Sequence, residues 1–148
     1  MALPALNLEG DLPVGVHRAT LSEVLQSFSF GSARRQMVAD RLIRIYELAV
    51  STGHLSRFIV FGSFVTAKSE PNDVDVVLLM EDSFELARIV NEAALLFQHM
   101  EAEAYFGASI FWTRRSGALD GEQAMIEHWQ IRRDGGFRGI VEIVQEPK

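Results

Sequence analysis

Two aspartates, Asp73 and Asp75, have the residue type and spacing of a site for a divalent cation. Valines alternate with them and an apolar run follows as far as Met80, so the segment predicts a buried β-strand. Successive side chains of a strand point to opposite faces, which would place both carboxylates on one face. Neighbouring carboxylates repel each other and are costly to bury without a partner. A hard cation such as Mg²⁺ would offset both costs, because it prefers carboxylate oxygens.

A turn offers a different explanation for one of the two aspartates. Pro71-Asn72-Asp73 is typical turn sequence, so Asp73 alone would need no ligand. The turn does not account for Asp75, which lies between Val74 and Val76 with more apolar residues after it. The pair therefore favours a metal site.

Nine residues separate a Gly-Ser dipeptide, Gly62-Ser63, from Asp73. The dipeptide follows an apolar strand expected at 57–61, and a strand that ends in Gly-Ser can present backbone N–H groups and a hydroxyl to a phosphate. Glycine also lets the backbone approach a ligand closely. If the two strands pair antiparallel, the Gly-Ser turn and the aspartates meet at the same edge of the sheet. Lys68, in the loop between them, either contacts a phosphate or is a solvated side chain.

This series, Gly62-Ser63 followed by Asp73-Val74-Asp75-Val76, resembles the signature of the DNA polymerase β-like nucleotidyltransferase superfamily. The chain is also similar to small, mostly uncharacterised bacterial proteins of that superfamily in residues 12–20 and 133–140. The resemblance implies a nucleotidyltransferase-like fold that binds a nucleoside triphosphate, with ATP expected, together with Mg²⁺ or Mn²⁺. The metal ligands and catalytic residues would be Asp73 and Asp75. The phosphates would contact Ser63 and the backbone amides of Gly62 and Phe64, and the loop residue Lys68 is a further candidate for a phosphate contact.

The superfamily places a third carboxylate on the next strand, where it helps to bind the metal and can act as the general base. In this chain the corresponding run is 105–112, and Ser109 stands near the expected position. Glu101 and Glu103 come just before that strand. Two functions stay open. The chain is either an enzyme that transfers a nucleoside monophosphate to a hydroxyl of a protein, RNA or small molecule, or a noncatalytic nucleotide-binding or regulatory module, such as one component of a toxin–antitoxin pair with a protein partner.

The length and composition narrow the class of protein. The 148 residues predict a single domain, 1–148, and the net charge of −6 argues against broad nonspecific nucleic-acid binding. The absence of cysteine excludes disulfides and thiolate metal sites. We see neither a signal-peptide pattern nor an apolar run of the roughly 20 residues needed to cross a bilayer. We therefore expect a cytoplasmic protein without membrane association.

The order of elements predicts an α/β (α+β) fold, in which helices pack on a mixed β-sheet. Residues 1–19 are expected to form an extended N-terminal arm. We expect helices at 20–27, 33–52, 82–101 and 120–129, strands at 57–61, 73–80 and 104–112, and a C-terminal β-hairpin that turns at 134–136. Capping boxes at Thr20–Glu23 and Asp82–Glu85 would start the first and third helices, and Val90 is expected among the apolar residues of the third. Ser32 would cap the second helix and Gly53 would end it.

Three further expectations concern single side chains. Arg35 is expected on the exposed face of the second helix. Trp112 and Trp129 are expected in the core rather than in a base-stacking platform. Arg133 and Arg138 flank the hairpin turn and would be solvated charges by position, although the resemblance favours Arg138 as a site residue.

Overall fold

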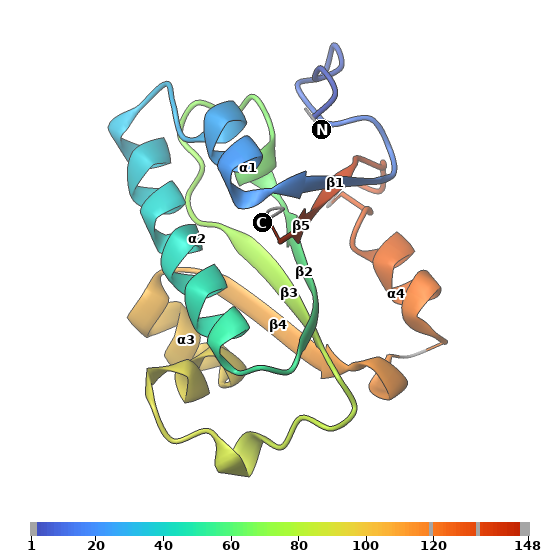
Figure 1. The fold of residues 1–148 in the computed structure, drawn as a ribbon. Helices are drawn as coiled ribbons and strands as arrows, with labels where there is room; N and C mark the ends of the chain where they lie inside the picture. Colours follow the sequence, from blue (N-terminus) through green and yellow to red (C-terminus); the bar gives the residue numbers. More distant parts are fainter. Residues whose placement is uncertain (1–2, 119, 133, 146–148) are drawn as a thin grey trace.

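A five-stranded mixed sheet forms the centre of the computed structural model, which describes residues 3–118, 120–132 and 134–145 (Figure 1). The strand order is β1-β5-β2-β3-β4. The second strand is antiparallel to both of its neighbours, β3 and β5, whereas the two outer pairs, β1–β5 and β3–β4, are parallel. The strands are β1 (Val16–Thr20), β2 (Leu55–Phe61), β3 (Asp75–Met80), β4 (Ser109–Arg114) and β5 (Ile140–Val144). This confirms the predicted mixed α/β (α+β) class.

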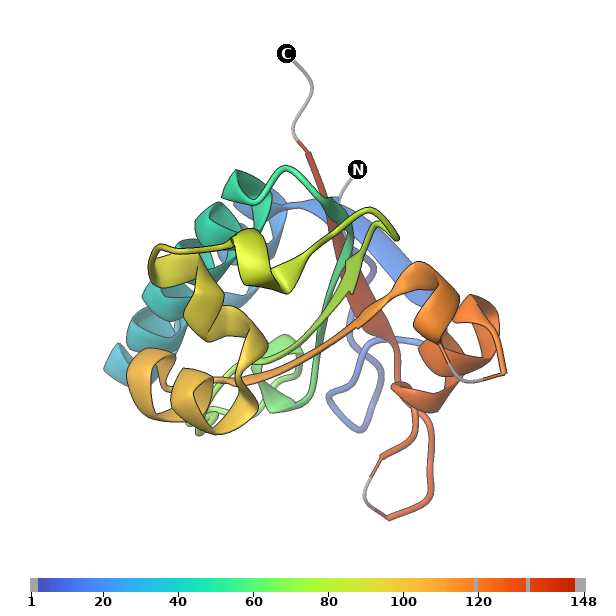
Figure 2. The ribbon, with the colours of Figure 1, turned by 90° about the horizontal axis from the view of Figure 1, so that it is seen from below.

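Three helices cover one face of the sheet, and a fourth lies on the other side (Figures 1 and 2). The first three are α1 (Leu21–Phe28), α2 (Ala33–Ser51) and α3 (His99–Phe106), and the fourth is α4 (Glu122–His128). Short 3-10 turns occur at Ser63–Val65, Leu86–Arg88, Glu92–Phe97 and Arg115–Gly117. The main core lies under α1–α3, and a smaller apolar cluster lies beneath α4 around Ile59, Val77 and Ile126. The face under α4 is therefore only partly covered.

The helix caps follow the sequence signals. Thr20 and Glu23 form the predicted capping box of α1, with each side chain bonded to the other residue's backbone N–H. Ser32 caps α2 by accepting a hydrogen bond from the Arg35 N–H at 3.0 Å. After α2 the chain turns at Gly53, whose φ of +75° suits glycine. These predictions are confirmed.

The continuous helix predicted over 82–101 is wrong. The segment forms separate 3-10 turns, and Val90, expected on its apolar face, is 92% exposed. The carboxylate of Asp82 does not cap a helix here, because it accepts a hydrogen bond from the backbone N–H of Ser116 at 2.9 Å. Asn91 caps the second turn instead, by accepting from Ala93. Regular helix begins only at His99 and runs to Phe106, so the strand predicted from Ala104 starts later, at Ser109.

Both ends of the chain differ from the prediction. The last residues of the expected arm form β1, which pairs with β5. The C-terminal hairpin is reduced to one antiparallel bridge between Ile131 and Phe137, because β5 pairs with β1 and β2 rather than with the segment before the turn. Residues 12–20 and 138–140 thus lie side by side: the Gly139 N–H donates to Leu12 O, and the Ile140 N–H donates to Gly15 O.

In the described ranges, no helix has the length and apolar character that crossing a membrane would require.

Candidate functional site

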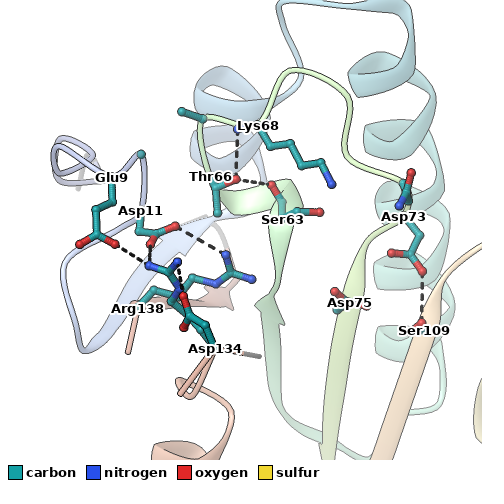
Figure 3. A pocket seen from close by; sticks show the side chains of 14 residues that line it. Glu9, Asp11, Ser63, Thr66, Lys68, Asp73, Asp75, Ser109, Asp134 and Arg138 are labelled. Atoms are coloured by element: carbon teal, nitrogen blue, oxygen red, sulfur yellow. Dashed lines mark hydrogen bonds and ion pairs between the residues drawn. The ribbon is translucent and has the colours of Figure 1, made fainter. Parts of the chain in front are cut away.

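A polar cavity of about 720 Å³ opens at one end of three neighbouring strands, β2, β3 and β4 (Figure 3). Phe61, Asp75 and Ser109 are partners across these strands and form one row at this edge. The Gly-Ser turn follows β2 directly, so the antiparallel pairing brings it to the start of β3, as predicted. The side chains and backbone around the cavity come from Glu9, Gly10, Asp11, Ser63, Thr66, Ala67, Lys68, Asn72, Asp73, Asp75, Ser109, Arg132, Asp134 and Arg138.

Gly62 makes room for the carboxylate of Asp75. Its backbone has a φ of +81° and a ψ of −165°, a region that only glycine adopts readily. A Cβ at this position would lie 2.0 Å from Oδ2 of Asp75. Glycine is therefore required here for two reasons: the backbone has a positive φ, and a side chain would clash with the Asp75 carboxylate.

Asp73 and Asp75 both line the cavity and are both half-buried. The strand β3 begins only at Asp75, but the Ser109 N–H donates to Val74 O, and Val74 is fully buried. The predicted alternation therefore extends back to Asp73, which lies just outside the strand. The hydroxyl of Ser109 donates to Oδ2 of Asp73 at 3.1 Å.

Ser109 occupies the position where a third carboxylate was expected. It is the partner of Asp75 across the parallel pair β3–β4, which confirms its predicted place. Glu101 and Glu103 lie on α3, are exposed and do not line the cavity. A neutral hydroxyl therefore stands beside the two aspartates.

The loop after Gly62 presents part of the expected phosphate site. Ser63 and Lys68 line the cavity, and Figure 3 shows the Lys68 side chain extending between Ser63 and Asp73. The loop is held by Thr66, whose hydroxyl donates to Ser63 O at 2.6 Å and accepts from the Lys68 N–H at 3.1 Å. Phe64 turns its side chain into the core, so only its backbone can take part.

Arg35 was predicted to be exposed, which is wrong: it is 5% exposed and supports this loop from below. Its guanidinium donates to the carbonyls of Phe28 (3.0 Å), Phe64 (2.9 Å), Thr66 (2.6 Å) and Lys68. Four carbonyls satisfy the buried charge and fix the course of the loop. Its neighbour in the sequence is an arginine too, and nothing in the helical pattern separates the two.

The opposite wall of the cavity carries ion pairs that the sequence did not reveal. One Nη of Arg132 bonds to Glu9 Oε2 at 2.6 Å and to Asp11 Oδ2 at 2.9 Å, and the other bonds to Asp134 Oδ2 at 2.8 Å. Arg138 lies 3.5 Å from the other oxygen of Asp11, which is buried. Asp134 also accepts from the Gly136 N–H, and this bond, with the charge of Arg132, holds the pKa of Asp134 below its ordinary value.

The N-terminal arm builds this wall. The Ala67 N–H donates to Gly10 O at 2.8 Å, which ties the arm to the loop after Gly62. The only sequence signal for this arrangement was the similarity in residues 12–20 and 133–140, which the β1–β5 pairing brings together. Arg138 is a cavity residue, as the resemblance favoured, whereas Arg133 lies outside the described residues.

The donor set suits a cation that arrives with a ligand. Within the described ranges, no group of three or more His, Cys, Asp or Glu side chains is placed to hold a metal ion. Mg²⁺ commonly takes one or two carboxylates, keeps several waters and completes its shell with substrate phosphates. Two carboxylates and a hydroxyl at one cavity edge fit that pattern.

Comparisons with known proteins place the chain in a family. No curated protein matches it, and no solved structure does either. A family model described as a family of unknown function (DUF6932) matches residues 4–144. The chain therefore belongs to this family.

Proposed function

We propose that this cavity binds a nucleoside triphosphate, with ATP the expected one, together with Mg²⁺ or Mn²⁺. The observation that carries the proposal is the convergence of Asp73, Asp75 and the Gly62-Ser63 turn at one edge of the sheet. The spacing of these residues resembles that of nucleotidyltransferases, and the cavity that they line is large enough for a nucleotide.

The net negative charge of the described cavity lining favours a ligand that binds together with a cation. Among the described residues, that lining holds five carboxylates and three cationic side chains. A free triphosphate would be repelled by the excess carboxylates, and a free divalent cation would lack enough ligands. The two bound together satisfy each other's requirements, because the cation offsets the charge of Asp73 and Asp75 and the phosphates supply its remaining oxygens.

Each residue of the aspartate side has a role in this proposal. Asp73 and Asp75 would hold the cation, which when bound would neutralise charge on the phosphates and orient them. Ser63 and Lys68 would donate to phosphate oxygens, and Gly62 would make room for the Asp75 carboxylate beside them. Arg35 would keep the loop of Ser63 in place through its carbonyl contacts.

We propose nucleotide binding, rather than catalytic transfer, as the main role of the cavity. Transfer would form a bond from an acceptor oxygen to the α-phosphorus, break the bond to the bridging oxygen and release pyrophosphate. The acceptor's proton would need a base, and a neutral serine, Ser109, stands where a third carboxylate would take that role. This favours the noncatalytic binding or regulatory module, in which a protein partner senses the bound nucleotide, over a fast transferase.

Isothermal titration calorimetry tests the proposal. ATP should bind the wild-type protein with Mg²⁺ present and lose most of its affinity when EDTA replaces the metal. The variants Asp73→Asn and Asp75→Asn should each weaken Mg²⁺–ATP binding by about tenfold or more, which corresponds to about 1.4 kcal/mol. Glu101→Gln is the matched control, since it removes an exposed carboxylate outside the cavity and should leave the affinity unchanged.

Two results would contradict parts of the proposal. Equal affinity with and without metal would remove the cation from the site. Fast pyrophosphate release from ATP would show that another group acts as the base, and it would restore the transferase as the first candidate.

A further inference from the structure

A second hollow, a groove of about 660 Å³, lies along β4 and beneath α4. It has an aromatic lining, in contrast to the polar cavity. Three rings form a continuous row in it: Trp129 lies 4.9 Å from Phe111 and Phe111 lies 4.8 Å from His99, measured between ring centroids. We call Trp129, Phe111 and His99 the aromatic row. Trp112 lines the groove as well. Both tryptophans are half-buried and pack against core clusters, as expected, Trp112 against the main core and Trp129 against the smaller cluster beneath α4, and both also border the groove.

The groove borders the same face of β3 and β4 as the polar cavity. Asp75 and Ser109 line the cavity, and the next residues on that face of β3 and β4 are Val77 and Phe111, which line the groove. Two residues of a strand span about 6.6 Å. One sugar is enough to bridge that distance between a phosphate at Asp75 and a planar ring at Phe111.

The groove combines apolar rings with polar side chains. His99 is nearly half exposed, with 47% of its side chain accessible, and His128 and Thr113 also border the space. The Nε1–H of Trp129 is buried and has no hydrogen-bond partner in the described part of the chain. A buried donor of this kind is unusual, and a ligand with an acceptor atom in its ring plane would supply the partner after a small shift. An aliphatic ligand would fill the groove without bonding to this N–H.

We propose that this groove binds the base of the nucleotide whose phosphates lie at Asp73 and Asp75, with the base stacked on the aromatic row. The inference rests on the proposed function, because the phosphates fix which end of the ligand faces the groove. Stacking suits every base, since each has a flat π-face, and a base stacked on an aromatic side chain typically contributes enough affinity to lose about tenfold when that ring is removed.

The two tryptophans of the chain both line the groove and therefore report on it directly. The probes are the ATP analogue with a methylene between its α- and β-phosphates, which cannot be transferred, and inorganic tripolyphosphate, which has no base. Each is titrated with Mg²⁺ into the wild-type protein, with tryptophan emission and calorimetry recorded. We expect the analogue to quench the emission and to bind at least tenfold more tightly than tripolyphosphate, which should leave the emission unchanged.

Phe111→Leu removes the central ring of the row and keeps an apolar side chain. It should weaken binding of the analogue by about tenfold and leave tripolyphosphate binding unchanged. Phe30→Leu is the matched control, because Phe30 is 69% exposed before α2 and lines neither hollow. His99→Ala is a second variant at the half-exposed end of the row, for use if Phe111→Leu lowers the unfolding temperature strongly, and it should weaken the analogue by several-fold.

The outcomes separate the two proposals. If the analogue and tripolyphosphate bind equally and neither changes the emission, the base does not enter the groove, while the metal–phosphate site stands. Unchanged analogue affinity in both ring variants would overturn the inference in the same way. If neither ligand binds at all, the proposed function itself fails and the groove inference fails with it.

Discussion

The polar cavity has two walls, and the carboxylates on each have different neighbours. We call the wall of Glu9, Asp11, Arg132, Asp134 and Arg138 the arginine wall, and the wall of Asp73, Asp75 and Ser109 the aspartate wall. On the arginine wall, Glu9, Asp11 and Asp134 all pair with Arg132 at 2.6–2.9 Å. On the aspartate wall, Asp73 accepts from the neutral hydroxyl of Ser109, at 3.1 Å. The first wall joins its carboxylates to arginines through ion pairs, whereas the second places two aspartates beside a neutral serine at a sheet edge.

This difference separates carboxylates that hold the fold from carboxylates that would hold a ligand. Arg132 and Arg138 join the N-terminal arm to the segment before β5 and so form one wall of the cavity. Two aspartates placed side by side repel each other, and a bound cation would offset that repulsion. The predictions below address the two walls in turn, beginning with the largest expected effect.

Gly62→Ala should be the most damaging single change, because the new methyl meets the Asp75 carboxylate in a backbone region that alanine avoids. We expect a loss of about 3 kcal/mol in unfolding free energy, measured by urea denaturation. Gly53→Ala is the control, since its φ of +75° is similar but no atom lies within 4 Å of the place that its Cβ would take, and it should cost about 1 kcal/mol. Adding Asp75→Ala to Gly62→Ala should recover part of the loss, and no recovery would mean that the carboxylate is not the obstacle.

Asp11→Asn and Asp73→Asn compare the walls directly. Asp11 is 5% exposed and its loss leaves Arg132 and Arg138 short of a buried partner, so we expect about 2 kcal/mol of destabilisation. Asp73→Asn should change the stability of the metal-free protein by less than about 0.5 kcal/mol. Thermal and urea unfolding without metal provide the comparison. A strongly destabilised Asp73→Asn variant would make the aspartate wall structural as well.

Ser109→Asp adds a third carboxylate to the aspartate wall and should therefore increase the difference between the two walls in metal binding. Mg²⁺ affinity should rise by about tenfold, or about 1.4 kcal/mol, while the metal-free protein becomes less stable because the like charges repel. Ser109→Ala, which removes the hydroxyl without adding charge, should show neither effect. Metal titrations of both variants beside the wild type make the test, and unchanged affinity in Ser109→Asp would place Ser109 outside the metal's reach.

The smallest expected effect is the pH dependence of the arginine wall. The Gly136 N–H and the charge of Arg132 lower the pKa of Asp134 in the folded state below its ordinary value of 3.8. Its contribution to stability is therefore fully present above that value and is lost as the pH falls through the lower folded pKa. The stability difference between wild type and Asp134→Asn should be constant from pH 7 to 5 and should shrink below pH 4. A difference that grows on acidification would contradict this assignment.

Local signals in the sequence predicted the aspartate wall well. The caps Thr20 and Ser32 placed α1 and α2, and the apolar runs on either side of Gly62-Ser63 placed β2 and β3. Antiparallel pairing of neighbouring strands then brought Ser63 to Asp75, and the next strand brought Ser109 beside them. All of these contacts join elements that follow one another along the chain.

The arginine wall could not be predicted in the same way, because it depends on contacts between the two ends of the chain. The Asp11–Arg132 contact joins residues 121 positions apart, and the parallel β1–β5 pair joins residues 124 positions apart, such as Val16 and Ile140. No periodicity in the sequence predicts such pairing. The prediction of a continuous helix over 82–101 failed for a related reason. Asp82 bonds to Ser116 on another element, so a local capping signal was overridden by a distant partner.

The most direct test of the central claim is a crystal structure of the wild-type protein grown with Mn²⁺ and the methylene analogue of ATP. Anomalous scattering locates the metal without assumptions about its ligands. We predict a single Mn²⁺ at coordination distance from carboxylate oxygens of both Asp73 and Asp75, bridged to the phosphates beside Ser63. A metal held instead by the carboxylates of the arginine wall, or a cavity that stays empty at saturating ligand, would contradict the account.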